Sequence, residues 1–175
     1  MKINRAPVLT LWAAVVAKQL GYPEDTALTL GKALAGLNAQ SKGQRLGIFE
    51  PSDEHHAKED NLKKPELAPE YQTVRLLGRE ISVKKTDQGL RADAGGQVID
   101  PASVKKYLEQ KFKENLSEVR QAMQTLAQST DPASLNRRGF ALYEEFRPAI
   151  PEGQRGWGAA GELSVEKIRQ LVEKH

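Results

Sequence analysis

The sequence predicts a mainly helical α+β protein, in which an N-terminal helical hairpin and a set of C-terminal helices flank a small antiparallel β meander. Apolar residues recur at three- and four-residue steps over residues 7–37 and again from residue 101 onwards, which is helical periodicity. Short apolar segments separated by glycines fill residues 73–99, a pattern typical of strands and tight turns.

The composition changes along the chain and predicts three parts. We expect a helical module over residues 1–49, a charged, proline-containing linker over 50–70 and an α+β body over 71–175. A helical pair this short cannot easily bury a core by itself. The module is therefore expected either to pack on the body as one unit or to form a homodimer.

The first two helices are expected to be joined by a tight turn. The first should run from Pro7 to Leu20, because proline suits the first helical turn and Gly21 suits a left-handed stop. Its apolar face is expected to contain Val8, Leu11, Trp12, Val15 and Leu20.

The second helix should open at Pro23, with two carboxylates in its first turn at the positive end of the helix dipole. It also carries a stripe of small residues spaced by four, Ala27, Gly31 and Ala35. Such a stripe allows another helix to approach closely, either within the chain or in a dimer.

The β meander is predicted as strands at residues 73–77, 80–84, 90–92 and 97–99, joined by glycine-containing turns. Two helices should then begin with a capping aspartate followed by proline, at Asp100 and at Asp131. A last helix should be capped by Ser164.

Composition excludes several kinds of chemistry. The chain has no cysteine, which excludes disulfides, thiolate metal sites and thiol catalysis. The N-terminus resembles a signal peptide, but Pro7 and the lack of a polar segment before the cleavage position favour a cytoplasmic protein. The apolar run is too short for a membrane span, so no membrane partner is expected.

The N-terminal segment carries the basic excess of the protein. Residues 1–47 hold six basic and two acidic residues, a net charge of +4 against +3 for the whole chain. A helix-turn-helix arrangement of residues 7–38 would present Thr26, Thr29 and Lys32 outward and bring Lys42 and Arg45 to phosphates. Base readout looks poor, because the second helix has no arginine, asparagine or glutamine before Asn38. The alternative is a core hairpin or a dimer surface.

The meander adds further candidates for nucleic-acid contact. It could act as a basic wing, or it could be a small sheet that is covered on one face by the next helix and basic on its open face. The candidate contact residues of the whole chain are Lys32, Lys42, Arg45, Arg75, Arg79, Lys84 and Lys85.

A glycine-rich loop over residues 153–161 is the main candidate for a protein contact. Together with Arg147, the residues Arg155 and Trp157 could hold a peptide, because tryptophan and arginine dominate interface hot spots. The alternative is that Trp157 folds back into the core.

Other clusters indicate no chemistry. The Asp53–His56 stretch contains metal-ligand types but lies in the expected linker, so no metal site is predicted. Glu144 and Glu145 would point about 100° apart on a helix and cannot readily share a substrate. No catalytic residue or cofactor is predicted.

The leading hypothesis is therefore a non-enzymatic binding protein with nucleic acid as its partner, engaged through the basic N-terminal module. The alternative is a protein–protein interaction or dimerisation module that uses the Trp157 loop and the N-terminal hairpin.

Overall fold

The computed structural model describes residues 1–45, 71–94, 97–148 and 160–174 of the chain. The predicted class, a mainly helical α+β fold, is confirmed. The elements in chain order are β1 (Lys2–Asn4), α1 (Arg5–Gln19), α2 (Glu24–Arg45), β2 (Tyr71–Leu76), β3 (Arg79–Thr86), β4 (Gly89–Ala94), β5 (Gln97–Val98), α4 (Pro101–Phe112), a 3-10 turn (Lys113–Asn115), α5 (Leu116–Gln128), α6 (Pro132–Phe146), β6 (Ala160–Glu162) and α7 (Val165–Lys174).

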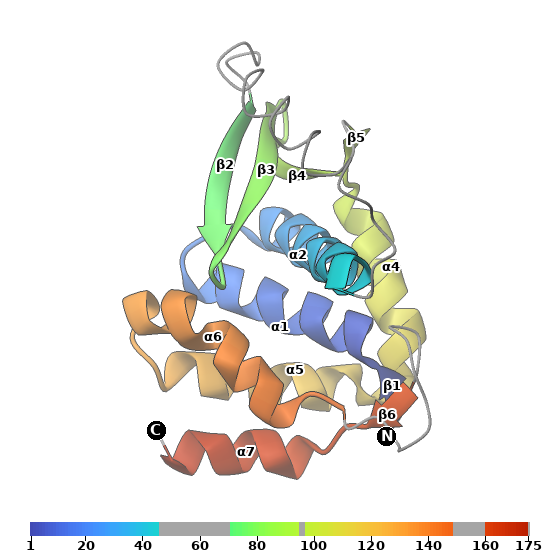
Figure 1. Ribbon diagram of the computed structural model, residues 1–175, viewed down its shortest axis with the longest axis vertical. Coiled ribbons are helices and arrows are strands. Elements are labelled where there is room, and N and C mark those ends of the chain that lie inside the picture. Colours follow the sequence, from blue (N-terminus) through green and yellow to red (C-terminus); the bar gives the residue numbers. More distant parts are fainter. Residues whose placement is uncertain (46–70, 95–96, 149–159, 175) are drawn as a thin grey trace.

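The helices are stacked around α1, which runs through the middle of the molecule (Figure 1). Helix α2 lies on one side of α1, helices α5 and α6 lie on the other, and α7 packs beyond them against α5. The strands β2, β3, β4 and β5 form an antiparallel sheet in sequence order beside α2. Strand β1 pairs with β6 and ties the two ends of the described chain together.

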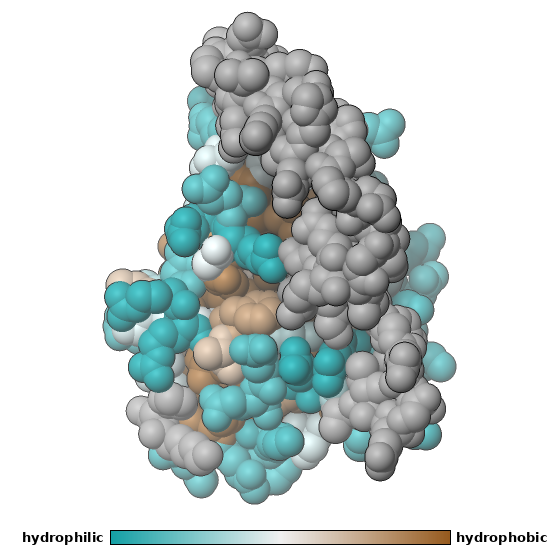
Figure 2. Space-filling model, in the orientation of Figure 1, coloured by the Kyte–Doolittle hydropathy of each residue, from teal (hydrophilic) through white to brown (hydrophobic). Residues whose placement is uncertain are grey.

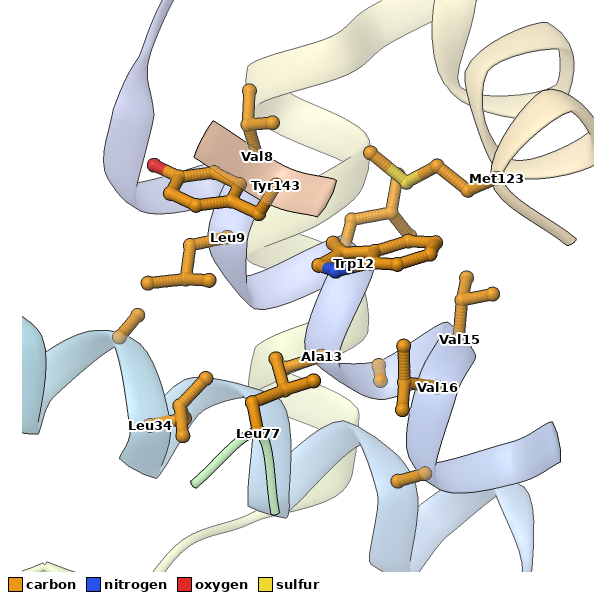
Figure 3. Close-up of a cluster of buried hydrophobic side chains, with 14 of the residues drawn as sticks. Val8, Leu9, Trp12, Ala13, Val15, Val16, Leu34, Leu77, Met123 and Tyr143 are labelled. Atoms are coloured by element: carbon orange, nitrogen blue, oxygen red, sulfur yellow. The ribbon is translucent and has the colours of Figure 1, made fainter. Parts of the chain in front are cut away.

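Helix α1 is buried on every side. All residues from Pro7 to Ala17 are buried, whereas the sequence pattern predicted a single apolar face. A helix that is apolar all round can be accommodated only inside a protein. The hydroxyl of Thr10, the one polar side chain in this run, donates to the carbonyl oxygen of Ala6 at 2.8 Å and is thereby satisfied. Figure 3 shows side chains from α2, α5, α6 and the β2–β3 turn gathered around those of α1.

Helix α2 approaches α1 closely along the stripe of small residues. At Gly31 an added methyl group would overlap the carbonyl oxygen of Thr10 and would lie 3.0 Å from the backbone nitrogen of Ala14. The close helix approach expected from the stripe is confirmed. The alternative prediction, that this stripe forms a dimer surface, is wrong, because its residues are buried within the chain and Gly31 lies against α1.

The other side of α2 supports the sheet. Thr29 Oγ1 accepts a hydrogen bond from the backbone N–H of Ala92 at 2.9 Å, and Thr26 Oγ1 donates to the carbonyl oxygen of Leu90 at 2.7 Å. Strand β5 does not reach this part of β4, so the two hydroxyls supply the hydrogen bonds that a neighbouring strand would otherwise make. The expectation that Thr26 and Thr29 face outward is wrong, since they are 2% and 0% exposed.

The tip of the β2–β3 hairpin docks between α1 and α6. Leu77 and Gly78 form the turn with φ values of 52° and 80°, the positive values that two-residue hairpin turns need. The Leu77 N–H donates to Asn136 Oδ1 at 2.9 Å, and the Leu77 side chain lies against Gly139 where a methyl group would overlap it. Trp12 Nε1 donates to the carbonyl oxygen of Gly139 at 2.9 Å. Gly139 of α6 therefore contacts both the hairpin, through Leu77, and the central helix, through Trp12.

Gly31→Ala is expected to destabilise the protein by about 1–3 kcal/mol, because the added methyl group forces α1 and α2 apart. Gly36→Ala is the matched control, since nothing lies within 4 Å of its added methyl group. Removing this glycine from a helix should stabilise the protein by about 0.5–1 kcal/mol. Urea unfolding of both variants measures the difference. Equal effects of the two substitutions would contradict the close approach.

Thr29→Val keeps the side-chain shape but leaves the N–H of Ala92 without its acceptor. We expect a loss of about 1–3 kcal/mol and faster hydrogen exchange at Ala92. Thr125→Val, at an exposed position of α5, is the control, because water can replace its hydrogen bond to the Gln121 carbonyl oxygen, and it should cost less than about 0.5 kcal/mol. Unchanged exchange at Ala92 would show that Thr29 does not hold the strand.

Candidate polyanion interface

The basic residues of the hairpin do not form one patch. Arg75 lies opposite Glu80 and its Nη1 is 3.9 Å from the glutamate Oε1. Arg79 begins β3, and Lys84 and Lys85 lie near its other end, about 17 and 20 Å away at 3.3 Å per residue. Successive strand side chains point to opposite faces, so the register places Arg75 on the face of Lys84 and Arg79 on the face of Lys85. The hairpin therefore presents no continuous basic surface.

A further meander cation, Arg91, belongs to the fold. Its side chain is buried, with Nη1 donating to the carbonyl oxygen of Leu90 at 2.9 Å and Nη2 lying 3.7 Å from Asp25 Oδ2. The guanidinium thereby completes the polar contact between β4 and the start of α2. It is not available to a ligand.

Lys32 lies at the contact between α2 and α4. Its Nζ lies 3.9 Å from the centroid of the Tyr107 ring, a cation–π geometry. Burial lowers the pKa of Lys32, and the charge of Lys111, four residues beyond Tyr107, lowers it further. Burial also raises the pKa of the half-buried Tyr107 phenol. We refer to Lys32, Tyr107 and Lys111 as the α2–α4 cluster.

The two lysines of the α2–α4 cluster act on each other's charge, and neither has a counter-ion among the described residues. Carboxylates lie within 4.0 Å of five other described cations, namely Lys18, Arg75, Arg91, Arg147 and Arg169. Among the residues that the structure describes, no carboxylate forms an ion pair with Lys32 or Lys111. Two like charges that act on each other without a counter-ion favour the binding of an anion.

Several predicted site residues lie beyond what the structure describes. Helix α2 extends to Arg45, but the side chains of Lys42 and Arg45 are outside the description, as are Arg155 and Trp157 and the Asp53–His56 stretch. Arg147 is described, and its Nη1 lies 3.9 Å from Glu144 Oε2. Its charge helps to lower the pKa of nearby Arg5, after the larger effect of burial.

Sequence reasoning identified Lys32 but missed its two neighbours. Helical periodicity alone predicts Tyr107 on the core face of its helix, and nothing in the pattern distinguishes Lys111 from the neighbouring lysines. The spacing of an aromatic residue and a lysine by four places both on one helix face, which is a usable signal. The position of Lys32 opposite that face depends on how α2 packs against α4, which the sequence pattern does not report.

In the described ranges, no group of three or more histidine, aspartate or glutamate side chains could hold a metal ion. None of the described helices is both long and apolar enough to cross a membrane. No family model, curated protein or solved structure matches the chain.

The pKa of Lys32 should lie below its ordinary value, and Lys111→Gln should raise it. Lys105→Gln on the same helix is the control and should leave it unchanged. Because the folded protein releases this proton at a lower pH than the unfolded chain, the group makes the free energy of unfolding rise with pH between the two pKa values. Carbon-13 NMR titration of the lysine ε-carbons measures the shift. An ordinary pKa for Lys32 in the native protein would contradict the geometry.

Proposed function

We propose that this protein is a non-enzymatic binding protein that holds nucleic acid against the α2–α4 cluster. The observation that supports it is that the like charges of Lys32 and Lys111 act on each other, and that neither lysine has a carboxylate partner among the described residues. A phosphodiester backbone would supply the missing negative charge.

The rest of α4 also carries positive charge. Between Pro101 and Lys113 the chain has four lysines and one glutamate. Lys105 and Lys106 are exposed on α4, and no described carboxylate forms an ion pair with them. A helix with this charge can follow a phosphate backbone over several contacts.

The expected mode of binding is independent of base sequence. Lysine ammonium groups act as point charges towards phosphates, whereas base readout relies mainly on arginine, asparagine or glutamine at base edges. The face of α2 that carries Thr26 and Thr29 is occupied by β4, so it cannot lie in a major groove as a reading helix. The proposal therefore keeps the nucleic-acid partner but moves the contact from the N-terminal module and the meander to α2 and α4.

The protein–protein alternative has less support. Its two proposed contact residues on the glycine-rich loop, Arg155 and Trp157, lie outside the described ranges, and the third, Arg147, is paired with Glu144. Contact through the Trp157 loop stays a prediction, as does the cytoplasmic location.

Fluorescence anisotropy with labelled single- and double-stranded DNA tests the proposal. We expect binding at low salt that weakens steeply as salt is added. The double variant Lys32→Ala with Lys111→Ala should reduce the slope of log K against log salt for duplex DNA by about 2, which corresponds to two phosphate contacts. Lys167→Ala, at an exposed position of α7, is a single-charge control that should leave the slope nearly unchanged.

Two results would reject the proposal. One is no binding of either DNA at low salt. The other is an equal loss of affinity per charge in the double variant and in Lys167→Ala, since this would mean that only net charge matters. Thermal unfolding of each variant establishes that the fold is intact before the binding constants are compared.

A further inference from the structure

A groove of about 340 Å³ lies along α1 between α2 and α5. Its floor is apolar and includes Ala14, Val15 and Leu28, which are 6%, 7% and 6% exposed. Ala27 on α2 also lines it. The small alanine side chains on both helices leave space that larger residues would fill. A volume of this size lies within the range of pockets that hold small molecules.

One wall of the groove is a row of long polar side chains on α5. Arg120, Gln124 and Gln128 follow each other at steps of four and therefore lie on one face of the helix. Lys18 in the last turn of α1 also lines the groove and lies 3.9 Å from Glu24 in the first turn of α2. The groove thus combines an apolar floor with hydrogen-bonding walls, and none of its lining residues belongs to the α2–α4 cluster.

Arg120 gives the groove its charge preference. Its side chain is half-buried at the groove wall, and no carboxylate of the described residues forms an ion pair with it. Because Lys18 and Glu24 offset each other, the guanidinium of Arg120 is the uncompensated charge among the lining residues. An arginine that is half-buried beside an apolar floor suits a ligand that has a carboxylate at one end and hydrocarbon at the other.

We propose that this groove binds a small amphiphilic carboxylate. The hydrocarbon part lies on the floor formed by Ala14, Val15 and Leu28, and its burial supplies most of the binding free energy. The carboxylate accepts hydrogen bonds from the guanidinium of Arg120, and the amide of neighbouring Gln124 can donate to it as well. This site is independent of the proposed nucleic-acid interface.

Decanoate is a suitable probe, with acetate and decylamine as comparisons. NMR amide-shift mapping should place decanoate at the groove, with shifts on α1 and α5, and calorimetry should give the affinity. Arg120→Gln should weaken decanoate binding by about tenfold or more, the loss expected for a charge-assisted hydrogen bond. Arg138→Gln, at an exposed position of α6, is the matched control and should bind decanoate like the unchanged protein.

Acetate and decylamine should bind far more weakly than decanoate, because each lacks one half of the proposed recognition. Val15→Phe, which fills the groove from its floor, should also weaken binding, and a chemical-denaturation curve shows whether that variant is folded. The proposal is overturned if decanoate does not bind, if its shifts map away from the groove, or if Arg120→Gln binds it as tightly as Arg138→Gln does.

Discussion

The burial of α1 on every side is the constraint on which the rest of the structure depends. A helix with apolar residues all round its axis cannot lie on a surface, so other elements must cover each side of it. Trp12 is the centre of this arrangement: its ring meets Phe146 edge-on at 5.3 Å between centroids, and its N–H donates to the carbonyl oxygen of Gly139. In the view of Figure 2, hydrophilic residues cover much of the described surface and hydrophobic ones emerge mainly near its middle.

This constraint also determines what α2 can do. One side of α2 is pressed against α1 at Gly31, and another carries Thr26 and Thr29, which hold the edge of β4. The helix that resembled a reading helix is therefore an internal support for the sheet. Lys32 projects from the part of α2 that faces α4 and meets Tyr107 there. The proposed interface depends on two elements that are far apart in the sequence.

Local signals allowed much of the fold to be predicted. Asp100 and Asp131 cap their helices through hydrogen bonds to Ala102 and Ser134, as a capping residue before a proline predicts. The stripe centred on Gly31 correctly predicted a close helix contact, because small side chains, which can be identified in the sequence, are what allow two helix backbones to approach. What could not be predicted depends on tertiary packing. Thr29 accepts a hydrogen bond from Ala92, which is far from it in the sequence, and the ring of Tyr107 contacts Lys32 of another helix.

Native-state hydrogen exchange of the α1 amides tests the central claim most directly. If α1 is the shared core of one cooperative unit, the amides between Leu11 and Ala17 should exchange only through global unfolding, with the same free energy as the slowest amides of α5 and α6. The contrary result would be exchange of α1 and α2 together at a clearly lower free energy, while α5 and α6 remain protected. The N-terminal helices would then be a separable module rather than the centre of the fold.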